Sequence, residues 1–232
     1  MATKEHAGFL FGGGEMGERM RRHDWRGSAM RVPTQWPDTL KSAVSLMLAA
    51  RFPMYLLWGD EHLCLYNDDY VTLLGNRHPD ALGQPFQSTW PEIWSSIHPL
   101  IMQAQAGDSV YVESLPLRVE RNQFEEEATF TLSYSPLRDA DGSIEGVFCA
   151  CMETTERVRA EAGLRDSEAR WRGLFNNMQE GFFLAQALRD RSGRMVDFRF
   201  LEMNPGFEQQ SGIVAADAAG RPVREVLPGI PE

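Results

Sequence analysis

Two cysteines near position 150 are the first residues whose type and spacing suggest chemistry. Cys149 and Cys151 are two residues apart in an apolar run typical of a β-strand, so both side chains point to one face. Two thiols on one face form either a redox-active or metal-responsive pair, or a pair of small buried side chains. Their Cα atoms would lie roughly 6.5–7 Å apart, at the limit for a disulfide. Because free cysteine is commonly a core residue, we favour the packing role.

Other side chains give little support for catalysis or metal binding. The five histidines lack paired ligand spacing, so we expect no zinc site. Ser133 and Ser135 have no matched histidine and aspartate partners. The segment GFLFGGGEMGER lacks the lysine of a phosphate-binding loop, so we interpret its glycines as a sign of flexibility. The sequence therefore favours a protein that is not an enzyme.

The composition limits the classes of partner that this chain is expected to bind. The 232 residues carry a formal charge of −10, which argues against nucleic acid or an anionic membrane as a partner. The apolar fraction of 43% suits a packed globular protein, and no apolar run reaches the roughly 18 residues of a membrane span. Three cysteines fit a reducing compartment. We therefore expect a cytoplasmic protein with no membrane segment within this chain.

The elements that position the two cysteines follow from periodicity. Residues 1–33 are rich in glycine and arginine and predict an irregular arm. An amphipathic helix is expected at 37–50, followed by two strands around the turn at 59–61 and then by short helices. A longer amphipathic helix precedes three strands near 109–121, 126–138 and 143–153. This order predicts an α+β fold in which helices cover one face of a five-stranded antiparallel sheet and leave a cavity.

The rest of the chain predicts a helical connector and a partial repeat. Leu164, Trp171 and Met178 recur every seven residues, which indicates either a weak parallel coiled coil or a solvated linker helix. After this helix the first pattern restarts: YNDDYVTLLG is matched by MNPGFEQQSG, and HPDALGQPF by AADAAGRPV. We expect a connector at 156–178 and a partial second domain at 179–232.

These motifs resemble the PAS domain family. The resemblance rests on the order of elements, on the motif Asn-x-x-(Tyr/Phe)-x-x-x-(Leu/Ser)-Gly and on the closing stretch PLRDADGSIEGVFCACMETTERV. The stretches WPDTLKSAVSLMLAARFPMYLLWG, LYNDDY and TLSYSPLRDADG are similar to the amino-terminal PAS domain of bacterial sensor histidine kinases. The resemblance places the PAS domain at 34–155 and implies a downstream kinase or other output domain in the parent protein.

The resemblance also points to candidate residues for ligand binding and for signal relay. Residues that would line the sensory cavity are Tyr66, Phe86, Trp90, Trp94, Phe130, Leu132, Tyr134, Cys149 and Cys151. The alternative is that so many aromatic rings simply fill this space. The motif Glu153-Thr154-Thr155 leads into the outgoing helix, so Glu153, Thr155, Leu164 and Trp171 are the signal-relay candidates.

The sequence leaves the cofactor unknown, and none is the favoured expectation. Some haem-binding relatives use a histidine of the long helix, which makes His98 the candidate haem ligand by resemblance. Photoactive flavin-binding relatives need a cysteine where this chain has LGQPFQS, which leaves only non-covalent flavin.

The expected function is a sensory and dimerisation module that binds a partner or small-molecule ligand and forms a homodimer through its N-terminal and connector helices. The alternative is a haem- or flavin-bearing gas or redox sensor.

Overall fold

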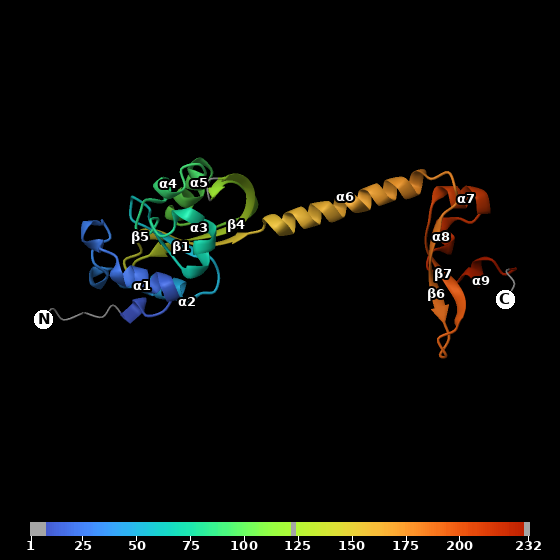
Figure 1. Ribbon diagram of the computed structural model, residues 1–232, viewed down its shortest axis with the longest axis horizontal. Coiled ribbons are helices and arrows are strands. Elements are labelled where there is room, and N and C mark those ends of the chain that lie inside the picture. Colours follow the sequence, from blue (N-terminus) through green and yellow to red (C-terminus); the bar gives the residue numbers. More distant parts are fainter. Residues whose placement is uncertain (1–7, 122–123, 230–232) are drawn as a thin grey trace. The chain divides into compact units, whose positions relative to one another are not determined.

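Five strands between residues 54 and 153 pair into one antiparallel sheet in the order β2-β1-β5-β4-β3. The computed structural model describes residues 8–121 and 124–229, and Figure 1 labels the elements. The strands are β1 (Met54–Trp58), β2 (Leu63–Tyr66), β3 (Val110–Arg121), β4 (Phe124–Arg138) and β5 (Ile144–Glu153). Buried and less buried residues alternate along β4, as expected when one face packs against helices. The α+β fold class predicted from the sequence is confirmed.

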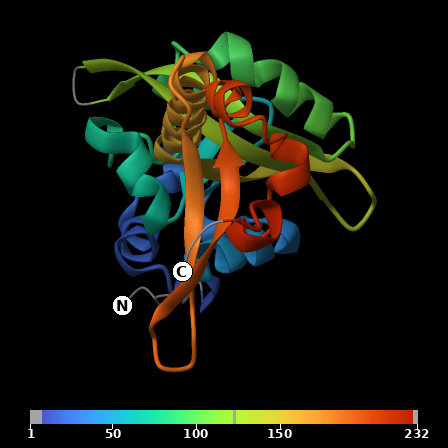
Figure 2. The ribbon, with the colours of Figure 1, turned by 90° about the vertical axis from the view of Figure 1, so that its right-hand side faces the viewer.

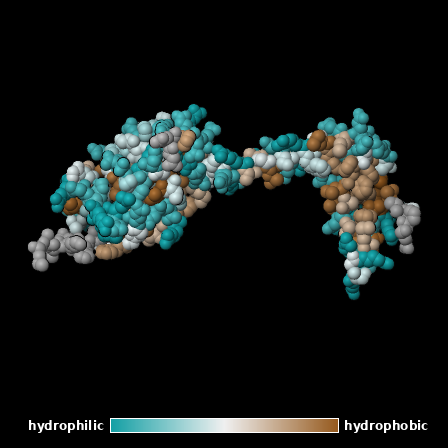
Figure 3. Space-filling view, in the orientation of Figure 1, coloured by the Kyte–Doolittle hydropathy of each residue, from teal (hydrophilic) through white to brown (hydrophobic). Residues whose placement is uncertain are grey.

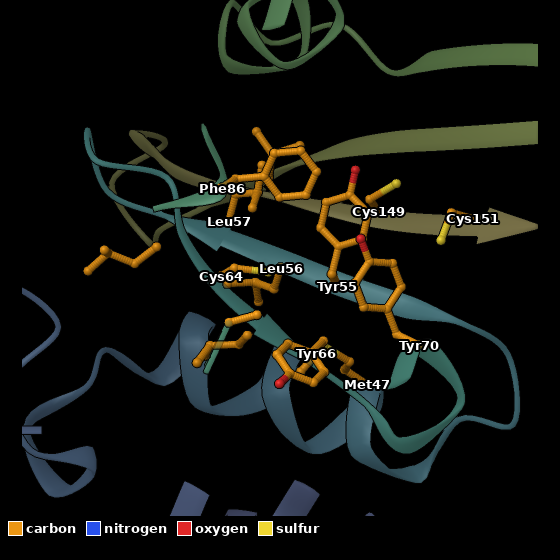
Figure 4. Packing of buried hydrophobic residues seen from close by; sticks show 14 of the residues in the cluster. Met47, Tyr55, Leu56, Leu57, Cys64, Tyr66, Tyr70, Phe86, Cys149 and Cys151 are labelled. Carbon is orange, nitrogen blue, oxygen red and sulfur yellow. The ribbon is translucent and has the colours of Figure 1, made fainter. Parts of the chain in front are cut away.

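Helices pack against this sheet in two groups. The longer helix α5 (Trp94–Gln105) contacts β3, β4 and β5, and the short helices α3 (Val71–Leu74) and α4 (Phe86–Thr89) precede it. Helix α2 (Asp38–Ala49) contacts β1, β2 and β4. Figure 4 shows α2 and the ring of Phe86 on opposite sides of β1. The core of the first unit therefore lies between two helical groups and the sheet.

The prediction of an irregular arm at 1–33 is wrong for the described residues 8–33. They form the helix α1 (Gly14–Arg22) and three short 3₁₀ turns, η1 (Gly8–Leu10), η2 (Trp25–Gly27) and the start of η3 (Pro33–Gln35). The side chains buried in the main core here are Leu10, Met16, Met20, Trp25 and Met30. Their spacing is irregular because helix and turns alternate, so no single period reveals them. Residues 1–7 lie outside the described residues.

The glycines before and within α1 serve close packing, which corrects their interpretation as flexible. A Cβ at Gly17 would overlap the carbonyl oxygen of Gly12, and one at Gly14 would overlap the carboxylate of Asp68. That carboxylate accepts a hydrogen bond of 2.7 Å from the backbone N–H of Met16, in the first turn of α1. Asp68 therefore caps a helix that lies 52 residues earlier in the sequence.

The second unit starts at Arg159 and contains a two-stranded sheet. Its strands are β6 (Phe183–Arg189) and β7 (Met195–Met203), which Figure 2 shows as a long hairpin. The helix α6 (Thr155–Asn177) precedes the hairpin, and α7 (Pro205–Ser211), α8 (Ala215–Ala218) and α9 (Val223–Val226) follow it. Helices α8 and α9 pack on β7 around a small core.

The two units share the same local construction. The side-chain oxygen of Asn67 accepts hydrogen bonds from the backbone of Tyr70 (3.2 Å) and Met54 (3.0 Å). Asn204 accepts two equivalent bonds, at 2.9 Å from the N–H three residues later and at 2.6 Å from the N–H just before β6. Both asparagines are buried. The repeat seen in the sequence thus has a structural cause, because each asparagine ties the end of one strand to the start of another.

Candidate functional site

A narrow cavity lies between the sheet and helices α3–α5 in the first unit. Its volume is about 30 Å³. The residues that line it are Tyr55, Tyr70, Leu73, Phe86, Trp90, Ile93, Ile97, Leu117, Val119, Phe130, Leu132 and Cys151. A single water needs about 10–15 Å³ of such space, so the cavity has room for about two waters. Aromatic and aliphatic side chains therefore fill most of the space where the resemblance implies a ligand.

The structure brings five of the nine pocket candidates to this cavity. Phe86, Trp90, Phe130, Leu132 and Cys151 line it, and their positions agree with the alternation along β4 and β5.

The other four candidates are not among the residues that line the cavity. Tyr66 is buried and its hydroxyl lies 3.0 Å from Nδ1 of His78. Trp94 is half-buried and lies against the ring of His98, with 4.5 Å between the ring centroids. Tyr134 on β4 and Cys149 on β5 are fully buried and lie opposite one another in the sheet.

Buried hydroxyls connect the wall of the cavity to the sheet. The hydroxyl oxygens of Tyr55 and Tyr134 are 2.7 Å apart, and the indole N–H of Trp90 donates to the hydroxyl of Tyr70 at 3.1 Å. The ring of Tyr55 stacks on Phe86 with a centroid distance of 5.1 Å. Figure 4 shows the rings of Tyr55 and Tyr70 close together, with Cys149 near Tyr55. Hydrogen bonding lets these polar groups stay buried without a large desolvation cost.

The cysteines have the properties of packing residues. All three are free, buried thiols. Burial raises the pKa of the Cys149 thiol to about 12, although hydrogen bonds with Tyr55 and Tyr134 oppose this rise. Burial likewise raises the pKa of Cys151 and Cys64 well above the ordinary range. Because the thiolate is the reactive form, this environment suppresses redox and metal chemistry.

Haem and flavin do not fit the cavity as the side chains are packed. Both are far larger than two waters, and His98 does not line the cavity. His98 instead lies on the flank of α5 against Trp94. Among the described residues, 8–121 and 124–229, no group of three or more His, Cys, Asp or Glu side chains is placed to hold a metal ion.

The relay candidates differ in their surroundings. Arg121 binds Glu153 through both terminal nitrogens, at 2.8 and 3.3 Å. The hydroxyl of Thr155 donates to Glu153 at 2.9 Å and accepts from the backbone N–H of Thr129 at 2.9 Å. These bonds fasten the start of α6 to strands β3 and β4.

Farther along α6 the candidates are exposed. Leu164 is 63% exposed and Trp171 is 52% exposed. Leu174 and Met178 are exposed as well. Within the described part of the chain the ring of Trp171 contacts that of Phe175 in the same helix, with 5.4 Å between the centroids, and the apolar side of the heptad pattern stays largely exposed.

Sequence reasoning missed two tyrosines of this site. Tyr55 and Tyr70 both line the cavity and both belong to the hydroxyl network. Tyr70 occupies the aromatic position of the motif that begins at Asn67. Tyr55 shares one face of β1 with Leu57, because side chains two residues apart in a strand point to the same side. Both signals were present in the sequence.

Comparison with known protein families identifies two matching segments of this chain. A family profile described as "PAS fold" matches residues 51–159, and one described as "PAS domain" matches residues 169–232. None of the curated proteins compared with this chain is a significant match. None of the helices in the described ranges is both long and apolar enough to cross a membrane.

Several solved structures are similar to part of this chain. An RNA-binding light-oxygen-voltage receptor is 19% identical with a TM-score of 0.39; the match covers 53% of this chain and 35% of that receptor. A PAS domain from Colwellia psychrerythraea is 15% identical with a TM-score of 0.40, covering 51% of this chain and 99% of that one. A sensory box sensor histidine kinase from Vibrio cholerae is 17% identical with a TM-score of 0.35, covering 49% and 89%.

Proposed function

Because this chain is a PAS domain followed by a second PAS-like unit, we propose that it is the sensory and dimerisation input module of a bacterial signal-transduction protein. PAS domains are sensory modules, so the family supports a role in signal sensing. The output domain that we propose is a histidine kinase, on the strength of the sequence resemblance to the amino-terminal PAS domains of such kinases. The module itself carries no catalytic role in this proposal.

The observation that carries the proposal is the attachment of α6 to the sheet. Arg121 on β3 holds Glu153, and Thr129 on β4 holds Thr155 at the first residue of the helix. A change in the packing of the β3–β4 edge would alter these bonds and thereby bias the position of α6. Signal relay then requires two arrangements of α6 that differ by only a few kcal/mol.

The exposed apolar side of α6 supports association of two copies. Leu164, Trp171 and Met178 recur at heptad spacing and are all exposed. On α2, Leu46 is 66% exposed. We propose that the homodimer forms through α2 and α6, as the amphipathic pattern of both helices suggests.

Charge on the heptad positions tests this dimer. The double variant Leu164→Glu/Trp171→Glu should shift the equilibrium towards monomer by at least about tenfold, since like charges would face each other in the seam. Analytical ultracentrifugation over a range of concentrations measures the dissociation constant.

A matched control uses the other side of the helix. Ala162→Glu/Ala169→Glu adds the same charges at the same spacing, on exposed positions two residues away from the seam. It should dimerise like the parent protein. If the parent sediments as a monomer at high concentration, or if both variants weaken the dimer equally, the proposed mode of association is wrong.

A further inference from the structure

A polar groove lies between α1 and the segment 77–89, outside the aromatic core. Its volume is about 1100 Å³. On α1 the groove is lined by positions 15, 18, 19 and 22, which share one side of the helix, and directly after the helix by His23. Met16 and Met20 are fully buried on the other side and hold the helix against the first unit. The groove therefore has walls fixed by packing.

The walls carry charges of both signs. Three arginines and three carboxylates line the groove, together with polar side chains of segment 84–89; the charged ones are Arg19, Arg22, Arg77, Glu15, Glu18 and Asp80. On α1 the charges are paired at i,i+4, with Glu15 on Arg19 and Glu18 on Arg22. Exposed pairs of this kind contribute little stability, so a ligand can compete with them. The balance of signs disfavours a polyanion and suits a solute that carries both charges.

Arg77 has one guanidinium nitrogen that is a hydrogen-bond donor without an acceptor. Its Nη2 atom binds Glu92 at 2.8 Å, and its guanidinium lies 4.1 Å from the ring centroid of Trp90. Its Nη1 atom is out of contact with solvent and has no hydrogen-bond partner among the described residues, so a ligand in the groove reaches it only when the guanidinium shifts on Trp90. A buried donor without an acceptor is costly, and a carboxylate is the acceptor that matches a guanidinium best.

We propose that this groove binds a small zwitterion of the amino-acid class, with its carboxylate on Arg77 and its ammonium group on Asp80. Asp80 is exposed and lies three residues after Arg77 in the same wall. This proposal rests on the sensory function proposed above, and it places the ligand outside the aromatic core.

Arg77 also connects the groove with the interior. It stacks on Trp90, whose indole N–H donates to Tyr70, and Tyr70 lines the internal cavity. A carboxylate that binds Arg77 changes the position of the guanidinium over Trp90 and so acts on the buried network. The aromatic core then transmits the signal rather than holding the ligand.

Thermal unfolding of the whole 232-residue chain tests the binding. Tryptophan fluorescence reports the first unit, because Trp25, Trp36, Trp58, Trp90 and Trp94 all lie there and only Trp171 does not. Each standard L-amino acid is added at about 10 mM, which saturates a site of sub-millimolar affinity; tryptophan and tyrosine are left out because of their own fluorescence and low solubility respectively. At least one should raise the Tm by about 5 °C. The same compound without its carboxylate or without its amino group should not. No rise with any amino acid overturns the proposal.

Variants then locate the site by calorimetric titration with the amino acid that gives the largest rise. Arg77→Lys loses the planar guanidinium, and Asp80→Asn loses the charge that binds the ammonium group; each should weaken binding by about tenfold. Arg118→Gln, at an exposed arginine of β3 outside the groove, should bind normally. Because Asp80 is exposed, its variant should fold, and undiminished binding by that variant overturns the assignment. Dimerisation is measured separately, so a failure here is distinguishable from a failure of the proposed function.

Discussion

Burial around Tyr55 decides what the polar side chains of the first unit can do. Tyr55, Tyr70 and Tyr134 are buried, and burial raises the pKa of each hydroxyl well above its ordinary value. The thiols of Cys149 and Cys151 share this environment. These groups stay neutral near neutral pH and act through packing and hydrogen bonds. The same chemistry that would make a reactive site at the surface makes a stable core here.

The thiols yield a prediction with a defined sign. The pKa of Cys149 is about 12 in the folded chain against an ordinary value of 9.0, so its folded thiol keeps the proton that the unfolded thiol loses. Stability should therefore be full below about pH 9 and fall as the pH rises from there towards about 12. Urea unfolding at a series of pH values measures this fall, and Cys149→Ala should reduce it.

Chemical labelling gives the complementary measurement. A thiol reagent at mildly alkaline pH should label the three buried cysteines slowly in the folded protein and rapidly in denaturant. Equal rates in the two conditions would show that the thiols are accessible and that the core is not packed as described.

At the scale of elements, α1 shows how a glycine-rich segment can specify structure. Gly17 faces the carbonyl oxygen of Gly12, so no side chain fits there. Gly17→Ala should destabilise the first unit by about 1–3 kcal/mol, because the helix must move away from its contacts. Denaturant unfolding followed by tryptophan fluorescence measures the loss.

Another helical glycine provides the control. Gly163 in α6 has open space around its Cα, so Gly163→Ala should be neutral or stabilise the helix by about 1 kcal/mol. If the two variants have the same effect on stability, close packing of α1 is not the reason for the glycine at position 17.

Periodicity predicted the elements whose residues repeat regularly. The expected helix at 37–50 is α2 at Asp38–Ala49, and the expected strands near 109–121 and 143–153 are β3 and β5. Periodicity did not predict the structure of residues 8–33, because that structure depends on contacts with residues distant in the sequence. One such contact is the hydrogen bond from Met16 to Asp68.

The candidate site was predictable in part for the same reason. Alternation along a strand identified Phe130 and Leu132 as cavity residues. The volume left between the rings depends on how all the side chains pack together, which no local pattern contains. The sequence therefore indicated which residues line the cavity, but not that their side chains would fill most of it.

At the scale of the whole molecule, the two units differ in how much they bury. The first unit has a five-stranded sheet with a large core, whereas the second has two strands and a core of Phe200, Met203 and Ala218. Large apolar side chains of the hairpin remain exposed, among them Phe183 (47%), Leu184 (50%) and Phe198 (42%). Figure 3 shows hydrophobic side chains gathered on this unit. The two units thus have cores of unequal size, and we expect their stabilities to differ accordingly.

Hydrogen exchange should reveal this inequality. An isolated two-stranded hairpin is marginal in water, so amides of β6 and β7 should exchange through local opening, at least about tenfold faster than those of β4 and β5. The comparison is matched, because both are antiparallel pairs whose amides are hydrogen-bonded in the ladder. A second copy that pairs with the exposed edge would add protection, so the protection of 183–203 should rise with protein concentration while that of 124–153 stays constant. Equal protection of the two pairs in a dilute, monomeric sample would show that the small core of the second unit suffices, and that its exposed apolar residues are not needed to hold it folded.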